Sequence, residues 1–200
     1  MIDLESRLDK LLHIKTSGRD DLIADGYRYP YEPTPYCVLE RLVGSGYITS
    51  RDKLIDYGCG KGRVGLYLSF KTKAKTLGIE YDSRMYRCAI ENRDSTVRGI
   101  TADFVQDRAE EYCVEPDVNR CYFFNPFSVE ILHKALARIF DSYYSSPREI
   151  LLFFYYPSEE YISYLMTEHL LEYLGDIDCR DMFDGNNDRE RIVIFRLFGK

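Results

Sequence analysis

The sequence predicts an α/β protein: an open, mostly parallel sheet of seven strands between two layers of helices. Short apolar strands alternate with amphipathic helical segments from residue 53 onward, a pattern typical of parallel sheets joined by crossover helices. The end of the chain differs, because two strands flank the turn-rich segment 184–188 and indicate an antiparallel β-hairpin. The 200 residues, 45% of them hydrophobic, are enough for one such core.

Two helical segments precede the first strand. Leucines recur with helical spacing between residues 4 and 12 and predict a short amphipathic helix. The segment 29–35 is rich in proline, and Thr34 stands where it can cap a second helix. We expect residues 1–30 to form a helical extension or lid, and residues 31–200 to form the main domain.

The alternating elements follow in order along the chain. Apolar runs predict strands at 53–57, 76–80, 103–106, 121–125 and 149–156. Amphipathic spacing predicts helices around 64–68, 85–90, 129–139 and 161–174. The final two strands are predicted at 177–183 and 191–198. The run 149–156 is apolar almost throughout, which indicates a strand buried on both faces.

Composition narrows the classes of partner. The formal net charge of -6 argues against broad contact with nucleic acid, which requires many neutralised phosphates. The six cysteines show no metal-type spacing, so we expect no metal site. With no signal peptide and no apolar run long enough for a bilayer, we expect a cytoplasmic protein without membrane contact. The oligomeric state is left open.

A glycine-rich turn follows the first predicted strand, as Asp56-Tyr57-Gly58-Cys59-Gly60-Lys61-Gly62. Glycine lets the backbone turn tightly and approach a ligand closely, where a Cβ would collide. The helix behind the turn presents unpaired N–H groups that can hold a carboxylate or a phosphate. Such a turn indicates a nucleotide-type cofactor, although a purely structural turn uses the same residues.

Polar side chains also end the next strands of the predicted sheet. Glu80 ends the second strand, where a carboxylate can accept both hydroxyls of a ribose. Asp107 follows the third strand, where it can either accept from an adenine amino group or cap a helix at 108–111. Asn125 ends the fourth strand before Pro126, which holds it at the sheet edge. Ligands of open α/β sheets bind at this edge.

Together these motifs resemble class I S-adenosylmethionine-dependent methyltransferases, which have a Rossmann-like fold. The resemblance covers roughly residues 30–198 and rests on the glycine turn, the strand-end acid, the Gln-Asp pair, the Asn-Pro-Phe turn and the final hairpin. The segment 31–35 is also similar to the Thr-Pro segment of small protein-lysine methyltransferases and Dot1-like enzymes. The Asn-Pro-Phe turn resembles the Asn-Pro-Pro-aromatic motif of amino-directed nucleic-acid methyltransferases, but it lacks the second proline.

The resemblance implies S-adenosylmethionine as cofactor and a role for each matching residue. The glycine turn would hold the amino-acid end of the cofactor, through Asp56, Gly58, Cys59, Gly60 and Gly62. Glu80 would bind the ribose, with Tyr81 against the adenine and Asp107 near its amino group. Asn125 would face the methyl sulfonium and act in catalysis, and Thr34 would either lie in the site or only cap its helix.

The sequence therefore predicts a methyltransferase that acts on a small molecule or a protein side chain, at nitrogen or oxygen, with nucleic acid disfavoured. Two other hypotheses stay open. The spacing Gly60-x-Gly62-x-x-Gly65 also fits an NAD-dependent oxidoreductase, although Asp56 is unusual in the strand leading to such a turn. A non-catalytic cofactor-binding module of the same fold is the other, because a fold does not fix a function.

Overall fold

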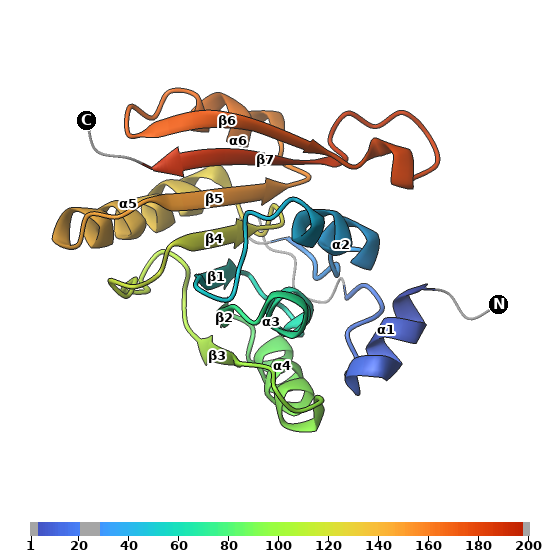
Figure 1. Ribbon diagram of the computed structural model, residues 1–200. Coiled ribbons are helices and arrows are strands. Elements are labelled where there is room, and N and C mark those ends of the chain that lie inside the picture. The colour runs from blue at the N-terminus through green and yellow to red at the C-terminus, as the bar shows by residue number, and fades with distance from the viewer. Residues whose placement is uncertain (1–3, 21–28, 198–200) are drawn as a thin grey trace.

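The computed structural model describes residues 4–20 and 29–197, and its seven strands form one sheet (Figure 1). The strands are β1 Lys53–Tyr57, β2 Lys75–Glu80, β3 Ala102–Gln106, β4 Arg120–Phe123, β5 Ile150–Tyr155, β6 Leu171–Asp178 and β7 Arg191–Leu197. The helices are α1 Leu4–Leu12, α2 Tyr36–Gly44, α3 Arg63–Thr72, α4 Ser83–Ser95, α5 Val129–Ser145 and α6 Glu159–Leu165, with a short 3-10 turn η1 at Arg180–Met182.

The strand order is β3-β2-β1-β4-β5-β7-β6. Strands β1 to β5 pair in parallel, whereas β7 runs antiparallel to both of its neighbours, β5 and β6. Figure 1 shows the strands in this order from β6 at the top to β3 at the bottom. The predicted α/β class with a mostly parallel seven-stranded sheet is therefore confirmed. Strand order reverses between β1 and β4, where open sheets of this kind bind ligands.

Alternating side chains of the central strands enter two separate apolar clusters. In β5, Leu151 and Phe153 pack with residues of α1, α2 and α3, whereas Leu152 and Phe154 pack with residues of α5 and α6. All six residues of β5 are buried, as the continuous apolar run predicts. Helices therefore cover both faces of the sheet and leave its carboxyl edge for the site.

The predicted helix at 161–174 is wrong in its second half. Helix α6 ends at Leu165, and residues 171–174 begin the edge strand β6. Because β6 pairs on one side only and none of its residues is buried, it lacks the alternation of buried and exposed residues that identifies a strand in sequence. A register shift between Tyr173 and Gly175 further obscures its period. The same strand ends at Asp178, so the predicted strand 177–183 gives way to η1.

Two further local predictions are corrected by the described residues. The connection 107–119 between β3 and β4 consists of turns without a helix, so Asp107 caps none. Helix α2 has Pro35 as its N-cap residue without a side-chain cap, so Thr34 is not the cap. Instead the Thr34 hydroxyl lies 3.2 Å from the Tyr122 hydroxyl. For Thr34, a tertiary contact therefore replaces the helix cap that the local sequence predicts.

A buried polar centre fixes the described part of the N-terminal segment to helices α2 and α3. The Arg63 side chain is 2% exposed, and it donates to Thr16 Oγ1 at 2.6 Å and to the Thr34 carbonyl at 3.1 Å. Asp9 lies beside it and accepts from the Tyr36 hydroxyl at 2.6 Å. Burial alone would raise the pKa of Asp9, but hydrogen bonds from Tyr36 and Thr16 and the charge of Arg63 lower it.

In the described ranges, 4–20 and 29–197, no helix is both long and apolar enough to cross a membrane. The predicted extension 1–30 and the last strand, predicted to residue 198, lie partly outside those ranges.

Candidate functional site

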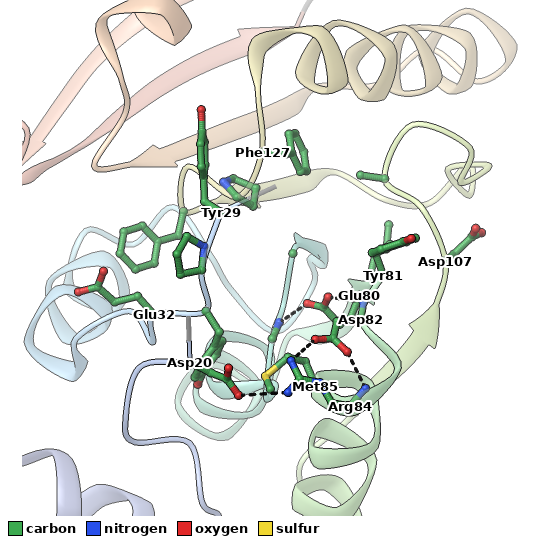
Figure 2. A pocket seen from close by; sticks show the side chains of 18 of the residues that line it. Asp20, Tyr29, Glu32, Glu80, Tyr81, Asp82, Arg84, Met85, Asp107 and Phe127 are labelled. Carbon is green, nitrogen blue, oxygen red and sulfur yellow. Dashed lines mark hydrogen bonds and ion pairs between the residues drawn. The ribbon is translucent and has the colours of Figure 1, made fainter. Parts of the chain in front are cut away.

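A cleft opens at the carboxyl ends of β1, β2, β3 and β4, with an empty volume of about 840 Å³ measured to its open mouth (Figure 2). Strand ends, the glycine turn and the described N-terminal residues together line it. Of the residues predicted for the site, the cleft is lined by Gly58, Gly60, Glu80, Tyr81 and Asp107.

The glycine turn forms the floor of the cleft and is bound to the neighbouring strand. The N–H groups of Gly58 and Cys59 donate to the Ile79 carbonyl at 2.9 and 3.1 Å. Gly58 and Gly60 both have left-handed backbones, with φ of +74° and +54°. A Cβ on Gly60 would come within 2.2 Å of the Tyr31 ring. The chain's own packing therefore requires glycine here, in addition to any ligand.

Glu80 lies at the centre of the cleft wall, at the end of β2. Its carboxylate accepts from the Gly60 N–H and the Asp82 N–H, both at 2.8 Å. Burial raises the pKa of Glu80, while these backbone N–H groups oppose the rise. A carboxylate offers about four acceptor positions, so Glu80 retains capacity for donors from a ligand. The residue thus both holds the turn and faces the cleft, as Figure 2 shows.

Asp56 is buried at the end of β1, and its Oδ2 atom has no hydrogen-bond partner among the described residues. Burial raises the pKa of this carboxyl group to about 8, and the charge of Glu80 adds to the effect. A buried acceptor without a donor is costly and is typical of sites that a ligand completes. Asp56 does not itself line the cleft, but the neighbouring turn residue Gly58 does.

The raised pKa of Asp56 predicts a pH dependence of stability. The folded protein holds this proton more tightly than the unfolded chain, whose carboxyl group has a pKa near 3.8. The free energy of unfolding should therefore fall as pH rises from about 4 to about 8 and stay lower above that. Asp56→Asn should flatten this fall by at least about 2 kcal/mol in urea unfolding between pH 5 and pH 8. An unchanged pH slope in the variant would contradict the assignment.

Tyr81 and Asp107 form one end of the cleft. Tyr81 is 41% exposed, and the Arg108 guanidinium lies 5.3 Å from its ring centre. The Asp107 N–H donates to the Glu80 carbonyl at 3.1 Å, and the Asp107 carboxylate accepts from the Arg108 N–H at 2.7 Å. An exposed ring and a strand-end acceptor beside Glu80 are suited to a planar base attached to a ribose.

Asn125 stands just beyond the end of β4, with a left-handed backbone at φ of 40°. Its Oδ1 atom is buried and has no hydrogen-bond partner among the described residues. Asparagine tolerates this conformation better than most residues, but the following proline adds strain. Such strain is typical of functional positions. Asn125 itself is not a lining residue, whereas Phe124, Pro126 and Phe127 on either side of it are.

Three predicted residues lie behind the cleft. Thr34 is 2% exposed and bonds to Tyr122 and Arg63. Cys59 is buried, and burial raises the pKa of its thiol far above the usual range. Gly62 is the N-cap residue of α3, and a Cβ on it would meet the Phe104 ring at 2.5 Å. In the structure these residues support the turn, and their predicted cofactor contacts stay predictions.

Sequence reasoning missed several cleft residues. Asp20 and Tyr29 come from the N-terminal segment, and Arg84 from α4. Asp82 could have been found, because an acid directly before a predicted helix is a cap signal, and its side chain accepts from the Arg84 N–H at 2.8 Å. The N-terminal residues carry no such signal, since only tertiary packing brings them to the cleft.

The histidines and cysteines do not join into a metal site. Among residues 4–20 and 29–197, no three histidine, cysteine or acidic side chains form a group that could hold a metal ion. All six cysteines are free thiols.

Among the comparisons with known proteins, the solved structures support the fold. No family model matches the sequence, and no curated protein matches it. Many solved structures are similar. The putative methyltransferase yhhF from Escherichia coli has a TM-score of 0.65 at 16% identity, over 92% of this chain and 100% of that one. An RNA methyltransferase from Salinibacter ruber, in complex with S-adenosyl-L-homocysteine, has a TM-score of 0.61 at 14% identity, over 84% and 95%.

A third similar structure is P. horikoshii TYW2 in complex with MeSAdo, with a TM-score of 0.60 at 16% identity, over 89% of this chain and 70% of that one. These likenesses extend over most of both chains. The protein therefore has the fold of class I S-adenosylmethionine-dependent methyltransferases, as the sequence motifs predict.

Proposed function

We propose that this protein is a methyltransferase that uses S-adenosylmethionine and transfers its methyl group to a nitrogen or oxygen of a small molecule or a protein side chain. The observation that carries the proposal is the joint position of the glycine turn and Glu80 on one cleft at the carboxyl edge of the sheet. Proteins of the same fold have been solved with S-adenosyl-L-homocysteine and MeSAdo bound, which supports the choice of cofactor.

The chemistry of the cleft residues fits this cofactor. The unpartnered Asp56 Oδ2 is an acceptor suited to the cofactor's ammonium group, and Glu80 keeps acceptor capacity for ribose hydroxyls. Tyr81 and Asp107 are suited to the adenine and its amino group. The predicted cofactor contacts of Thr34, Cys59 and Gly62 remain part of the proposal.

When bound, S-adenosylmethionine would supply an activated methyl group for transfer to a lone pair of the acceptor. The chain's task is to align the acceptor and to exclude water. Asn125 Oδ1 lacks a donor, so we assign it the role of accepting a hydrogen bond from the acceptor and orienting its lone pair. The acceptor's displaced proton leaves to water at the open mouth.

The test of this role is methyl transfer by an Asn125→Ala variant. Wild-type protein incubated with methyl-tritiated S-adenosylmethionine and a cell lysate should label an acceptor, and the variant should label it about 10- to 100-fold more slowly. Binding of S-adenosylhomocysteine should be unchanged. Asn186→Ala, on the exposed loop between β6 and β7, is the matched control and should retain wild-type labelling. Equal labelling by the Asn125 variant would contradict the role.

The oxidoreductase hypothesis is not favoured, because β7 is antiparallel whereas dinucleotide folds usually continue in parallel. A non-catalytic module would bind the cofactor and fail the labelling test.

We also propose that the N-terminal extension acts as a lid, and its described residues Asp20, Tyr29 and Pro30 line the cleft. A cytoplasmic location is proposed from the six free thiols.

A further inference from the structure

The charge of the cleft is strongly one-sided. Six carboxyl groups line it, and Arg84 is the one basic side chain among its described lining residues. Figure 2 shows Arg84 between two of these acids, and its guanidinium lies 3.0 Å from Asp82 and 3.9 Å from Asp20. The arginine is thus neutralised inside the cleft. In the proposed complex the cofactor contacts Glu80 and Asp107, so the other acids of the lining are not required for cofactor binding.

Two of the remaining acids are Glu32 and Glu110, which both line the cleft. Glu32 is exposed and lies 3.5 Å from Arg19, and Glu110 lies 4.0 Å from Arg108. Even with Arg19 and Arg108 counted, acids outnumber basic groups among the described residues around the opening. A phosphodiester chain requires several lysine or arginine contacts to offset its charge. The cleft offers it repulsion instead.

Aromatic rings flank Asn125 at the same opening. Phe124 and Phe127 line the cleft directly before and after the Asn125-Pro126 pair, although Phe127 is only 5% exposed. Tyr29 also lines the cleft and is 43% exposed. Aromatic rings attract cations to their faces, and among these three Tyr29 has the exposure for such a contact. The unpartnered Asn125 Oδ1 requires an N–H or O–H donor. Acidic lining residues, an exposed aromatic ring and a buried acceptor together describe a site for an amine.

Resting on the proposed methyltransferase function, we infer that the methyl acceptor is an aliphatic amine that arrives as a cation, from either a polyamine or a lysine side chain. The amine attacks as its free base, so it first releases one proton to water at the mouth. Its lone pair then forms the N–C bond while the C–S bond breaks with its electrons left on sulfur, and the product is a methylated ammonium. Glu32 and Glu110 draw the cation to the mouth and repel nucleic acid.

The test is equilibrium binding to the full-length protein saturated with S-adenosylhomocysteine. Three probes are compared: spermidine, an acetylated lysine tripeptide and a 20-nucleotide RNA. We expect one of the two amine probes to bind at least tenfold more tightly than the RNA, and which of them binds identifies the source of the amine. Tighter binding of the RNA, or binding of neither amine, would overturn the inference.

Charge variants locate the effect. The double variant Glu32→Gln and Glu110→Gln should bind the amine about three- to tenfold more weakly than the wild type. Its amine binding should also depend much less on salt concentration. Asp141→Asn is the matched control, since Asp141 is an exposed acid on α5 that pairs with Arg138 at 3.8 Å outside the cleft. Its amine binding should equal that of the wild type. Binding of S-adenosylhomocysteine is measured separately, so its loss would count against the proposed function and not against the amine.

Discussion

Replacing Glu80 with glutamine is expected to weaken the binding of S-adenosylhomocysteine by about 30- to 1,000-fold, which corresponds to about 2–4 kcal/mol. In the proposed complex a single carboxylate accepts from two ribose hydroxyls while it holds the Gly60 and Asp82 N–H groups. Glutamine keeps one oxygen acceptor and replaces the other with a donor that faces an N–H group. Calorimetric titration of the variant measures the change directly.

Two controls separate loss of contact from loss of fold. Glu91→Gln changes an exposed acid on α4, in the same βα unit but outside the cleft, and it should bind as the wild type does. Thermal unfolding of Glu80→Gln should stay cooperative. If the folded variant binds S-adenosylhomocysteine with wild-type affinity, Glu80 is not a cofactor ligand.

Replacing Gly60 with valine should destabilise the protein by about 2–5 kcal/mol and abolish cofactor binding. A β-branched residue cannot easily adopt φ of +54°, and its Cβ would come within 2.2 Å of the Tyr31 ring. The Tyr31 hydroxyl donates to the Thr16 carbonyl at 2.6 Å, so the ring is held in place. Urea unfolding measures the loss.

Two causes of the destabilisation at Gly60 can be separated: backbone strain and the collision of the new Cβ with the Tyr31 ring. Gly60→Ala should be less harmful when Tyr31 is also changed to alanine, because the double variant removes the collision and keeps the strain. Gly44→Ala is the matched control, since its Cβ would meet nothing within 4 Å and Gly44 has no left-handed backbone. That change should be neutral or slightly stabilising. Equal losses at Gly60 and Gly44 would contradict this explanation.

The parts of the fold that follow local patterns could be predicted from sequence. Strands β1 and β2 with their helices have strong apolar periodicity, and the glycine turn marks the point between them. These elements place Gly58, Gly60 and Glu80 at one edge, where the structure has them. The edge strand β6 could not be predicted in the same way, because its conformation depends on pairing with β7 and not on a periodic pattern of apolar residues in its own sequence.

The candidate site likewise contains residues that local sequence patterns predict and residues that only tertiary packing brings to it. Residues at or directly after the end of a strand, such as Glu80 and Asp107, reach the cleft because the backbone of the strand leads them there. Tyr31 and Arg63 depend on a fold-back of the N-terminal segment across the turn, which pairs Asp20 with Tyr31 in an isolated β-bridge. No local rule predicts that contact. The misassigned cap at Thr34 has the same cause, since Tyr122 and Arg63 bind the residue instead.

The glycine turn and Glu80 are proposed to form the site for S-adenosylmethionine. Isothermal titration of the wild-type protein with S-adenosylhomocysteine tests this proposal, with NADH titrated in parallel. We expect one site per chain with a micromolar dissociation constant, and no binding of NADH. Absence of S-adenosylhomocysteine binding by a folded protein, or binding of NADH in its place, would contradict it.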